Sequence, residues 1–440
     1  MLWPSELNSM DVTVQRLKAY WKKYRPEILI FLAVFGVRFL YASAALFWFG
    51  SDSFVSFSDA DTFVREAHNI LEHGVMSQAS APPYLPDPLR TPLYLWFLAL
   101  LLGSGFSLFG IVIIQNLLVG IIGVMVYRLG QILFVNARVG SVAGLLFALE
   151  PSSVYWNNLL MSDNLFAVLF ILSVYLFFTR RWYWFSALFA FATLTRPIGL
   201  YLFPLFLLGT FLFSLSFKRI IIMSLVFFVI ISPWMMRNKV LFGNFELSTA
   251  GWLNLYLFTV KEFSLRHNLP LPMPSIPVDY YPWDEKKVLY NYEFTAAHFF
   301  KERTLEVLRK YPVAYPVFHI VSGIRGIRNH DYQYLVDYVV APLWTRFDRR
   351  LGMVFVLFGY GFWWLIYGGA FTLLFSKNYR RTVLFLLVLI VFNSLLVGYN
   401  GLISGGGRYT MPFLPLWFLL GAFGWSQVYQ FFSKPYHKEV

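Results

Sequence analysis

The chain of 440 residues contains no cysteine, so disulfide bonds, thiolate metal sites and cysteine nucleophiles are excluded. Charge is also scarce: Asp, Glu, Lys and Arg make up 13% of the residues, whereas 58% are hydrophobic. The chain has neither a Gly-Lys-Ser/Thr phosphate-binding loop nor a dinucleotide-binding glycine fingerprint. No fixed-period repeat is present, which argues against a solenoid. A soluble nucleotide-dependent enzyme is therefore not indicated.

Hydrophobic runs of about 20 residues, long enough to cross a bilayer, recur along the chain. They predict an all-α polytopic membrane protein, a helix bundle with juxtamembrane helices and outer loops. The first run is expected to stay as a signal anchor, because it is long and lacks a small-residue cleavage motif. Ten crossings are predicted, at residues 27–49, 107–127, 139–158, 163–179, 183–196, 198–216, 219–236, 353–375, 382–400 and 409–431.

The formal net charge of +13 lies largely in short basic clusters between these runs. Such clusters are typical of cytoplasmic loops and can attract anionic lipid, so no nucleic-acid partner is inferred. The basic stretch 11–25 places the N-terminus in the cytoplasm by the same bias. With ten crossings, every cluster and the C-terminus then lie inside.

Four segments are predicted: a cytoplasmic amphipathic N-terminus (1–26), an N-terminal transmembrane catalytic module (27–236) that includes an outer loop (50–91), a large extracytoplasmic loop (237–352) and C-terminal transmembrane helices (353–440). Residues 92–106 are short and flanked by Pro92 and glycines, which favours a juxtamembrane or re-entrant helix. The second loop is expected to begin irregularly (269–282) and to contain amphipathic helices at 286–310 and 312–327, the latter on the membrane surface.

Asp59 and Asp61 follow the first hydrophobic run and should face outward. Carboxylates beside a bilayer are costly, and are functional candidates for that reason. A carboxylate there can accept a proton from an attacking hydroxyl or hold a cation beside a phosphate. The alternative is that Asp59 caps a helix that begins there while Asp61 favours its dipole. On that helix Phe63 and Ala67 share the face of Asp59, whereas Arg65 and Glu66 are expected to point elsewhere.

Further polar residues end the other outward segments. We take Asp163 as a third catalytic candidate, with substrate-binding candidates Arg90, Tyr94, Glu150, Arg196, Arg237, Arg408 and Tyr409. Guanidinium groups bind phosphate by paired hydrogen bonds while an acid activates the acceptor, as a lipid-phosphate substrate requires. For any single arginine, snorkelling or an ion pair with a nearby acid is the simpler explanation.

Weaker candidates remain. His68, Glu72 and His73 have spacing compatible with a metal site, but a solvated helix face explains them more simply. His319 and His330 lack ligand spacing. Gly405-Gly406-Gly407 could bring backbone close to a phosphate, although a flexible hairpin before the last crossing is the simpler explanation.

The ordered set of motifs resembles the GT-C fold glycosyltransferases, specifically the superfamily of dolichyl-phosphate-mannose protein mannosyltransferases and aminoarabinose transferases. The resemblance spans nearly the whole chain. The matching motifs are Asp59-Ala60 with Phe63 and Ala67 (where the family usually has Tyr at the position of Phe63), Arg90-Thr91-Pro92-Leu93-Tyr94, Ser162-Asp163-Asn164-Leu165-Phe166, Leu194-Thr195-Arg196-Pro197, Pro233-Trp234 with Arg237-Asn238, and Arg408-Tyr409 with Pro412.

The resemblance implies inverting sugar transfer from a polyprenyl-phosphate donor, with no cofactor required and a divalent cation as an option. It places the catalytic base at Asp59. The family often has Asp-Glu where this chain has Asp-Ala-Asp, so the choice between Asp59 and Asp61 stays open. The acceptor would be a lipid, a glycan or a protein. The soluble C-terminal domain of some relatives is missing, which argues against the eukaryotic protein-modifying activity specifically.

Two other function classes remain. A transporter or flippase of lipid-linked saccharides should have polar or broken helices near the bilayer midplane and often a duplicated half. A non-catalytic scaffold of the cell envelope would not require acids and arginines together. The absence of an endoplasmic-reticulum retrieval signal favours a bacterial plasma membrane, with the site on its extracytoplasmic side.

Overall fold

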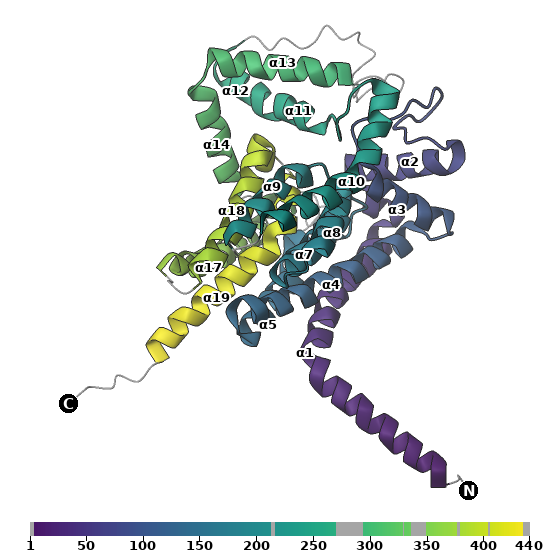
Figure 1. The fold of residues 1–440 in the computed structure, drawn as a ribbon, viewed down its shortest axis with the longest axis vertical. Helices are drawn as coiled ribbons and strands as arrows, with labels where there is room; N and C mark the ends of the chain where they lie inside the picture. Colours follow the sequence, from purple (N-terminus) through teal and green to yellow (C-terminus); the bar gives the residue numbers. More distant parts are fainter. Residues whose placement is uncertain are drawn as a thin grey trace, which may run out of the picture.

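The computed structural model describes residues 4–212, 216–269, 294–328, 330–335, 349–375, 379–403 and 405–433. Within these ranges all regular structure is helical and no strand occurs, which confirms the predicted all-α fold (Figure 1). The first half contains α1 (Pro4–Phe49), η1 (Ser51–Val55), α2 (Ser58–His73), α3 (Pro92–Gly103), α4 (Leu108–Phe134), α5 (Ala137–Leu149), α6 (Pro151–Asn157), α7 (Ser162–Phe178), α8 (Trp182–Thr195), α9 (Ile198–Leu212) and α10 (Phe217–Phe242). The second half contains α11 (Ala250–Asn254), η2 (Leu255–Val260), α12 (Lys261–Arg266), α13 (Phe294–Lys310), α14 (Ala314–Gly326), α15 (Tyr332–Leu335), α17 (Arg349–Thr372), η5 (Leu373–Phe375), α18 (Arg380–Val397), η6 (Gly398–Leu402), η7 (Gly406–Tyr409), η8 (Met411–Phe413) and α19 (Leu414–Ser433).

Helices occupy all ten predicted crossing intervals, but they differ in length. Five segments of the described chain are long and apolar enough to cross a membrane: Ala19–Phe49, Leu108–Phe134, Phe217–Phe242, Gly352–Thr372 and Arg380–Leu402. A sixth candidate combines α6 and α7, which are bent by 115° at the break between them. The protein is therefore polytopic, while the count of ten depends on helices that are shorter than a full bilayer crossing.

Close backbone contact joins the first helices of the bundle. α1 packs against α4 and α5, which also pack against each other. A β-carbon on Gly140 would lie 2.2 Å from the carbonyl oxygen of Tyr127, so only glycine allows α4 and α5 to approach this closely. Small residues serve this purpose in membrane helix pairs, where apolar side chains alone give no preference for helix over lipid.

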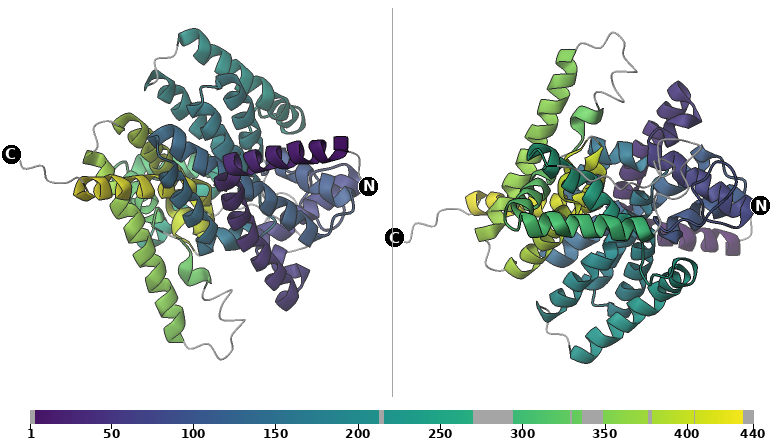
Figure 2. Two further views of the ribbon diagram at one scale, coloured as in Figure 1. Left: turned by 90° about the horizontal axis from the view of Figure 1, so that it is seen from below. Right: turned by 90° about the horizontal axis from the view of Figure 1, so that it is seen from above.

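The beginning of α1 and the end of α19 lie at one end of the bundle, and α2, α11, α12 and α13 lie toward the other (Figure 1). Seen from above, α13 crosses the bundle (Figure 2). The helix expected at 92–106 is α3, which begins at Pro92 and packs against α2. α14 covers most of the helix expected at 312–327.

The second predicted loop is more ordered than expected. Residues 250–266 form continuous helical turns, which were not predicted, and they pack against α13 around Tyr256, Phe263 and Phe300. α13 confirms the last part of the helix predicted at 286–310. Residues 270–293, which include most of the predicted irregular stretch, lie outside the described residues.

Short turns between the last two long helices bring the rear of the chain to its front. α18 ends before Gly398, and η6, η7 and η8 follow before α19 begins. η7 carries Arg408, whose guanidinium contacts the first turn of α2, 349 residues earlier in the sequence. This contact defines the candidate site.

Candidate active site

Asp59 lies in the first turn of α2 but does not cap it. The N-cap residue is Phe57, and no side chain caps the helix. The carboxylate of Asp59 instead faces two guanidinium groups. Arg408 Nη1 donates a hydrogen bond of 2.6 Å to Oδ2, and Arg90 Nη2 lies 3.8 Å from Oδ1. The predicted alternative, that Asp59 is a helix cap, is therefore wrong.

The environment of Asp59 favours its ionised form. Burial alone would raise the pKa of this carboxyl, but the positive charges of Arg408 and Arg90, with a smaller contribution from Arg196, outweigh burial and lower it. The side chain nevertheless keeps 39% of its surface exposed. Asp59 is thus a carboxylate at neutral pH that an incoming molecule can reach.

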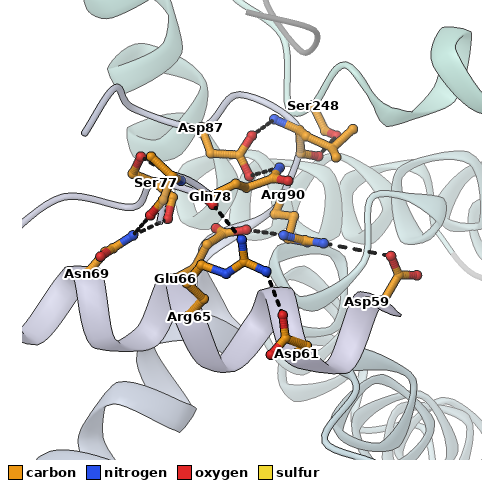
Figure 3. Close-up of polar contacts among 12 residues, drawn as sticks. Asp59, Asp61, Arg65, Glu66, Asn69, Ser77, Gln78, Asp87, Arg90 and Ser248 are labelled. Atoms are coloured by element: carbon orange, nitrogen blue, oxygen red, sulfur yellow. Dashed lines mark hydrogen bonds and ion pairs between the residues drawn. The ribbon is translucent and has the colours of Figure 1, made fainter. Parts of the chain in front are cut away.

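Asp61 has a different setting two residues later. Its carboxylate accepts a hydrogen bond of 2.5 Å from Arg65, one turn along the same helix, and its side chain is 57% exposed. Figure 3 shows Arg65 between Asp61 and the backbone carbonyl of Gln78, to which it also donates at 3.5 Å. Only Asp59 of the two acids joins the cluster of arginines.

Arg90 links Asp59 to a second, fully buried acid. Its guanidinium donates a hydrogen bond to Glu66, whose side chain has no exposed surface, and lies 4.4 Å from the ring centroid of Phe63. The expectation that Glu66 points elsewhere is wrong. Glu66 follows Asp59 by seven residues, which is two helical turns, so both acids lie on one face of α2 (Figure 3).

Asp87 completes the buried end of this network. Its oxygens accept hydrogen bonds from the Leu89 backbone N–H, at 2.7 Å, and from Gln78 Nε2, at 3.0 Å. Burial raises the pKa of Glu66 to about 8, with Arg90 opposing the rise and the nearby negative charge of Asp87 adding to it. Arg90 therefore contacts two different acids: Asp59, which is ionised and partly exposed, and Glu66, which is buried and favours its protonated form.

Arg196 and Asp163 form a second pair next to Arg408. Arg196 follows the last residue of α8 and donates a hydrogen bond to Asp163 in the first turn of α7. The Tyr409 ring lies beside both guanidinium groups, with centroids 5.4 Å from Arg196 and 4.8 Å from Arg408. Burial and the charge of Arg408 lower the pKa of Arg196 to about 10. Two largely buried guanidinium groups that repel each other favour a negatively charged group beside them.

Of three further predicted site residues, two have their polar contacts elsewhere and one reaches this network only through a backbone carbonyl. Tyr94 is buried and its hydroxyl donates a hydrogen bond of 2.7 Å to Gln115. Glu150 caps α6 by accepting hydrogen bonds from two backbone N–H groups. Arg237 donates to the backbone carbonyl of Asp87, at 3.1 Å, and lies beside Trp234. Each of these three side chains therefore has contacts within the protein that account for its position without a substrate.

The weaker candidates gain little from the structure. His68, Glu72 and His73 lie on an exposed part of α2, where Glu72 approaches the two histidines at 4.0 and 3.8 Å. Across the described part of the chain, no group of three or more His, Asp or Glu side chains could hold a metal ion. His319 contacts the backbone carbonyl of Leu395, and His330 contacts the Tyr367 hydroxyl.

Arg38 is a buried charge that lies outside the candidate site residues predicted from the sequence. It lies inside the first crossing and has no exposed surface. Its guanidinium donates to the Asn157 and Ser153 side chains, at 2.7 and 3.0 Å, and to the backbone carbonyl of Phe147, at 3.2 Å. An arginine inside an apolar run is visible in sequence, and such residues need internal partners. In this protein the hydrogen bonds of Arg38 connect α1 to the end of α5 and to α6.

We predict that Arg38→Met lowers the free energy of unfolding by roughly 3 kcal/mol, because several buried acceptors lose their donor. Thermal unfolding in detergent measures the change. Arg138→Gln, which alters an exposed arginine on α5, is the matched control. Equal melting temperatures for the two variants would contradict the structural role of Arg38.

Residues 88–236 match the family model of dolichyl-phosphate-mannose-protein mannosyltransferases. This match supports a membrane glycosyltransferase of the GT-C type. It covers about a third of the chain and includes Arg90, Asp163 and Arg196 but neither Asp59 nor Arg408. No curated protein sequence matches the chain.

Proposed function

We propose that this membrane glycosyltransferase moves a sugar from a polyprenyl-phosphate-linked donor to an acceptor hydroxyl or amine on the extracytoplasmic face, with Asp59 as general base. The observation that carries the proposal is the contact of Asp59 with Arg408, next to Arg196. A base and two phosphate-binding groups then lie side by side. Three chain regions far apart in sequence supply them, and the family match supports the reaction class.

The reaction needs one bond formed and one broken. The acceptor oxygen or nitrogen attacks the anomeric carbon, and Asp59 takes the proton that the acceptor loses. The bond between the anomeric carbon and the phosphate oxygen breaks, and the electron pair leaves with the polyprenyl phosphate. Arg408 and Arg196 stabilise the negative charge that develops on this leaving group. A phosphate leaves as a stable anion, so no general acid is required. Attack opposite the phosphate inverts the anomeric carbon.

Donor binding should also activate the base. With Arg408 and Arg90 beside it, Asp59 is a weak proton acceptor, because both charges lower its pKa. A phosphate bound to Arg408 competes directly with Asp59 for that guanidinium. Asp59 would then lose its nearest positive partner and become more basic when the donor is in place. An enzyme built this way avoids activating water or acceptor in the absence of donor.

Guanidinium groups supply positive charge at the proposed phosphate position, so we propose that no divalent cation is needed. Dialysis against EDTA should leave the rate of sugar transfer unchanged, and added Mg²⁺ or Mn²⁺ should not raise it. The measurement is transfer of labelled sugar by purified protein. Loss of transfer with EDTA, restored by one metal, would contradict the proposal.

The acceptor is a lipid, a glycan or a protein, and the membrane is proposed to be a bacterial plasma membrane. A transfer assay that offers each acceptor class with a labelled polyprenyl-phosphate sugar tests the proposed function. Product formation that requires the carboxylate of Asp59 supports it. No product from any acceptor class with protein that binds the donor would contradict it.

One observation favours a transporter of lipid-linked saccharides instead. The 115° bend between α6 and α7 resembles the broken helices found in transporters. The two functions differ in their dependence on Asp59. A transporter with Asp59→Asn should largely keep its flux across vesicles, whereas the transferase should lose turnover and keep donor binding.

A further inference from the structure

Asp331 is a buried acid directly before α15, outside the motifs identified in the sequence. It is 4% exposed, and its backbone has φ of 54°, in the left-handed region that few residues other than glycine, asparagine and aspartate adopt readily. Its carboxylate accepts a hydrogen bond of 3.2 Å from Trp156 Nε1. It also accepts hydrogen bonds from the backbone N–H groups of Gly405 and Gly407.

These contacts fix the glycine run that leads into Arg408. On its other side the run packs against η6, since a β-carbon on Gly406 would lie 2.6 Å from the carbonyl oxygen of Asn400. Gly405 has φ of 78° and precedes η7. The glycine N–H groups, which the sequence suggested for phosphate, thus bind an internal carboxylate. The run is held on two sides, one residue before Arg408.

We infer that Asp331 is a positioning residue for sugar transfer: its carboxylate anchors Gly405 and Gly407 so that Arg408 reaches Asp59. The inference rests on the proposed function, because it assumes that Arg408 and Asp59 take part in the reaction. Asp331 itself does not touch the proposed reacting atoms. Its effect passes through the backbone of η7 to the guanidinium that lies 2.6 Å from Asp59.

The charge state of Asp331 gives the anchor a pH dependence. Burial raises the pKa of Asp331 to about 7, although its hydrogen-bond donors and the charge of Arg408 oppose the rise. The neighbouring residues His330 and Tyr332 are both neutral. Burial lowers the pKa of His330 to about 3. Burial raises the pKa of Tyr332, whose hydroxyl keeps its proton and donates it in a hydrogen bond to Glu150.

The sign follows from the two states of the loop. If the loop that carries Gly405 and Gly407 opens, Asp331 is exposed to water and has its ordinary pKa of about 4. Between about pH 4 and 7, Asp331 is therefore protonated in the closed loop and ionised in the open loop. The stability of the closed loop therefore falls as pH rises toward 7 and is level above it. Protection of the Gly405 and Gly407 amides against hydrogen exchange, corrected for intrinsic rates, should follow this curve.

Two substitutions separate the carboxylate from the backbone strain. Asp331→Gly removes the side chain, and glycine accepts a positive φ without strain. Asp331→Asn keeps an acceptor and tolerates this conformation but cannot ionise. Hydrogen exchange of peptides containing Gly405 and Gly407 should be about tenfold faster or more in the glycine variant. In the asparagine variant it should be close to wild type and lose its pH dependence.

Transfer kinetics complete the test. Asp331→Gly should lower kcat by about 10–100-fold, the usual range for a residue that orients a functional side chain, with little change in the KM for acceptor. Asp331→Asn should recover most of that loss. Glu306→Gln, a change at an exposed acid on α13, should match wild type in exchange and kcat.

Two results would overturn the inference: unchanged exchange at the glycine run in Asp331→Gly, or faster exchange with unchanged kcat per folded molecule. The exchange measurement needs no activity. If wild-type protein transfers no sugar, the proposed function fails, and unchanged exchange in the glycine variant would still show separately that Asp331 does not anchor the loop.

Discussion

Asp59→Asn is expected to lower kcat for sugar transfer by about 10³-fold, within the range that a general base contributes. Asparagine has nearly the same shape and can still accept a hydrogen bond from Arg408, so the fold and donor binding should persist. It cannot take a proton from the acceptor. The measurement is single-turnover transfer of labelled sugar by purified protein, together with donor binding.

Asp61→Asn is the matched comparison, because it makes the same change two residues later on the same helix. Asp61 is exposed and pairs with Arg65, so kcat should stay within about threefold of wild type, as for an ordinary surface substitution. A larger loss in Asp61→Asn than in Asp59→Asn would assign the base to Asp61. Retained transfer in Asp59→Asn would remove Asp59 from the mechanism.

Arg408→Gln is expected to lower kcat/KM for the donor by about 10²–10³-fold, the cost of removing one group that stabilises a developing anion. The phosphate loses a guanidinium with paired donors, and this is the source of the loss. Asp59 also loses its nearest positive partner, which raises its pKa, makes it a stronger base and offsets a small part of the loss. Arg408→Lys restores the charge but not the paired hydrogen bonds, so it should recover part of the rate.

Arg65→Gln controls for the loss of one arginine on α2, since Arg65 pairs with Asp61 and not with Asp59. Steady-state kinetics with varied donor concentration compare the variants. If Arg408→Gln keeps the donor KM and kcat of wild type while Arg65→Gln does not, the phosphate is bound elsewhere.

The sequence predicted the parts of the site that depend on local spacing. The helix beginning near Asp59 and the shared face of Phe63 and Ala67 follow from helical periodicity. The same rule could have found Glu66, two turns from Asp59, because a seven-residue separation returns to the same face. The basic clusters predicted that Asp59, Arg196 and Arg408 share one face, and in the structure Arg408 contacts Asp59 while the Tyr409 ring lies beside both arginines.

Contacts made by the folded chain could not be predicted in the same way. Glu66 and Arg90 are 24 residues apart and meet only because the loop after α2 folds back onto that helix. No short-range sequence pattern indicates this pairing. Asp331 meets Gly405 and Gly407 only because η6 and η7 fold between α18 and α19. Tyr94 and Glu150 matched motifs, but their contacts are those of buried structural residues. A motif specifies residue types, whereas packing decides which of them remain accessible.

A structure of the protein bound to a polyprenyl phosphate tests the central claim most directly, through the distance from the Arg408 guanidinium to the phosphate. The account predicts phosphate oxygens about 3 Å from guanidinium nitrogens of Arg408, next to Arg196, with the Arg408 contact to Asp59 lengthened. A phosphate bound away from both arginines, with the contact between Asp59 and Arg408 intact, would contradict it.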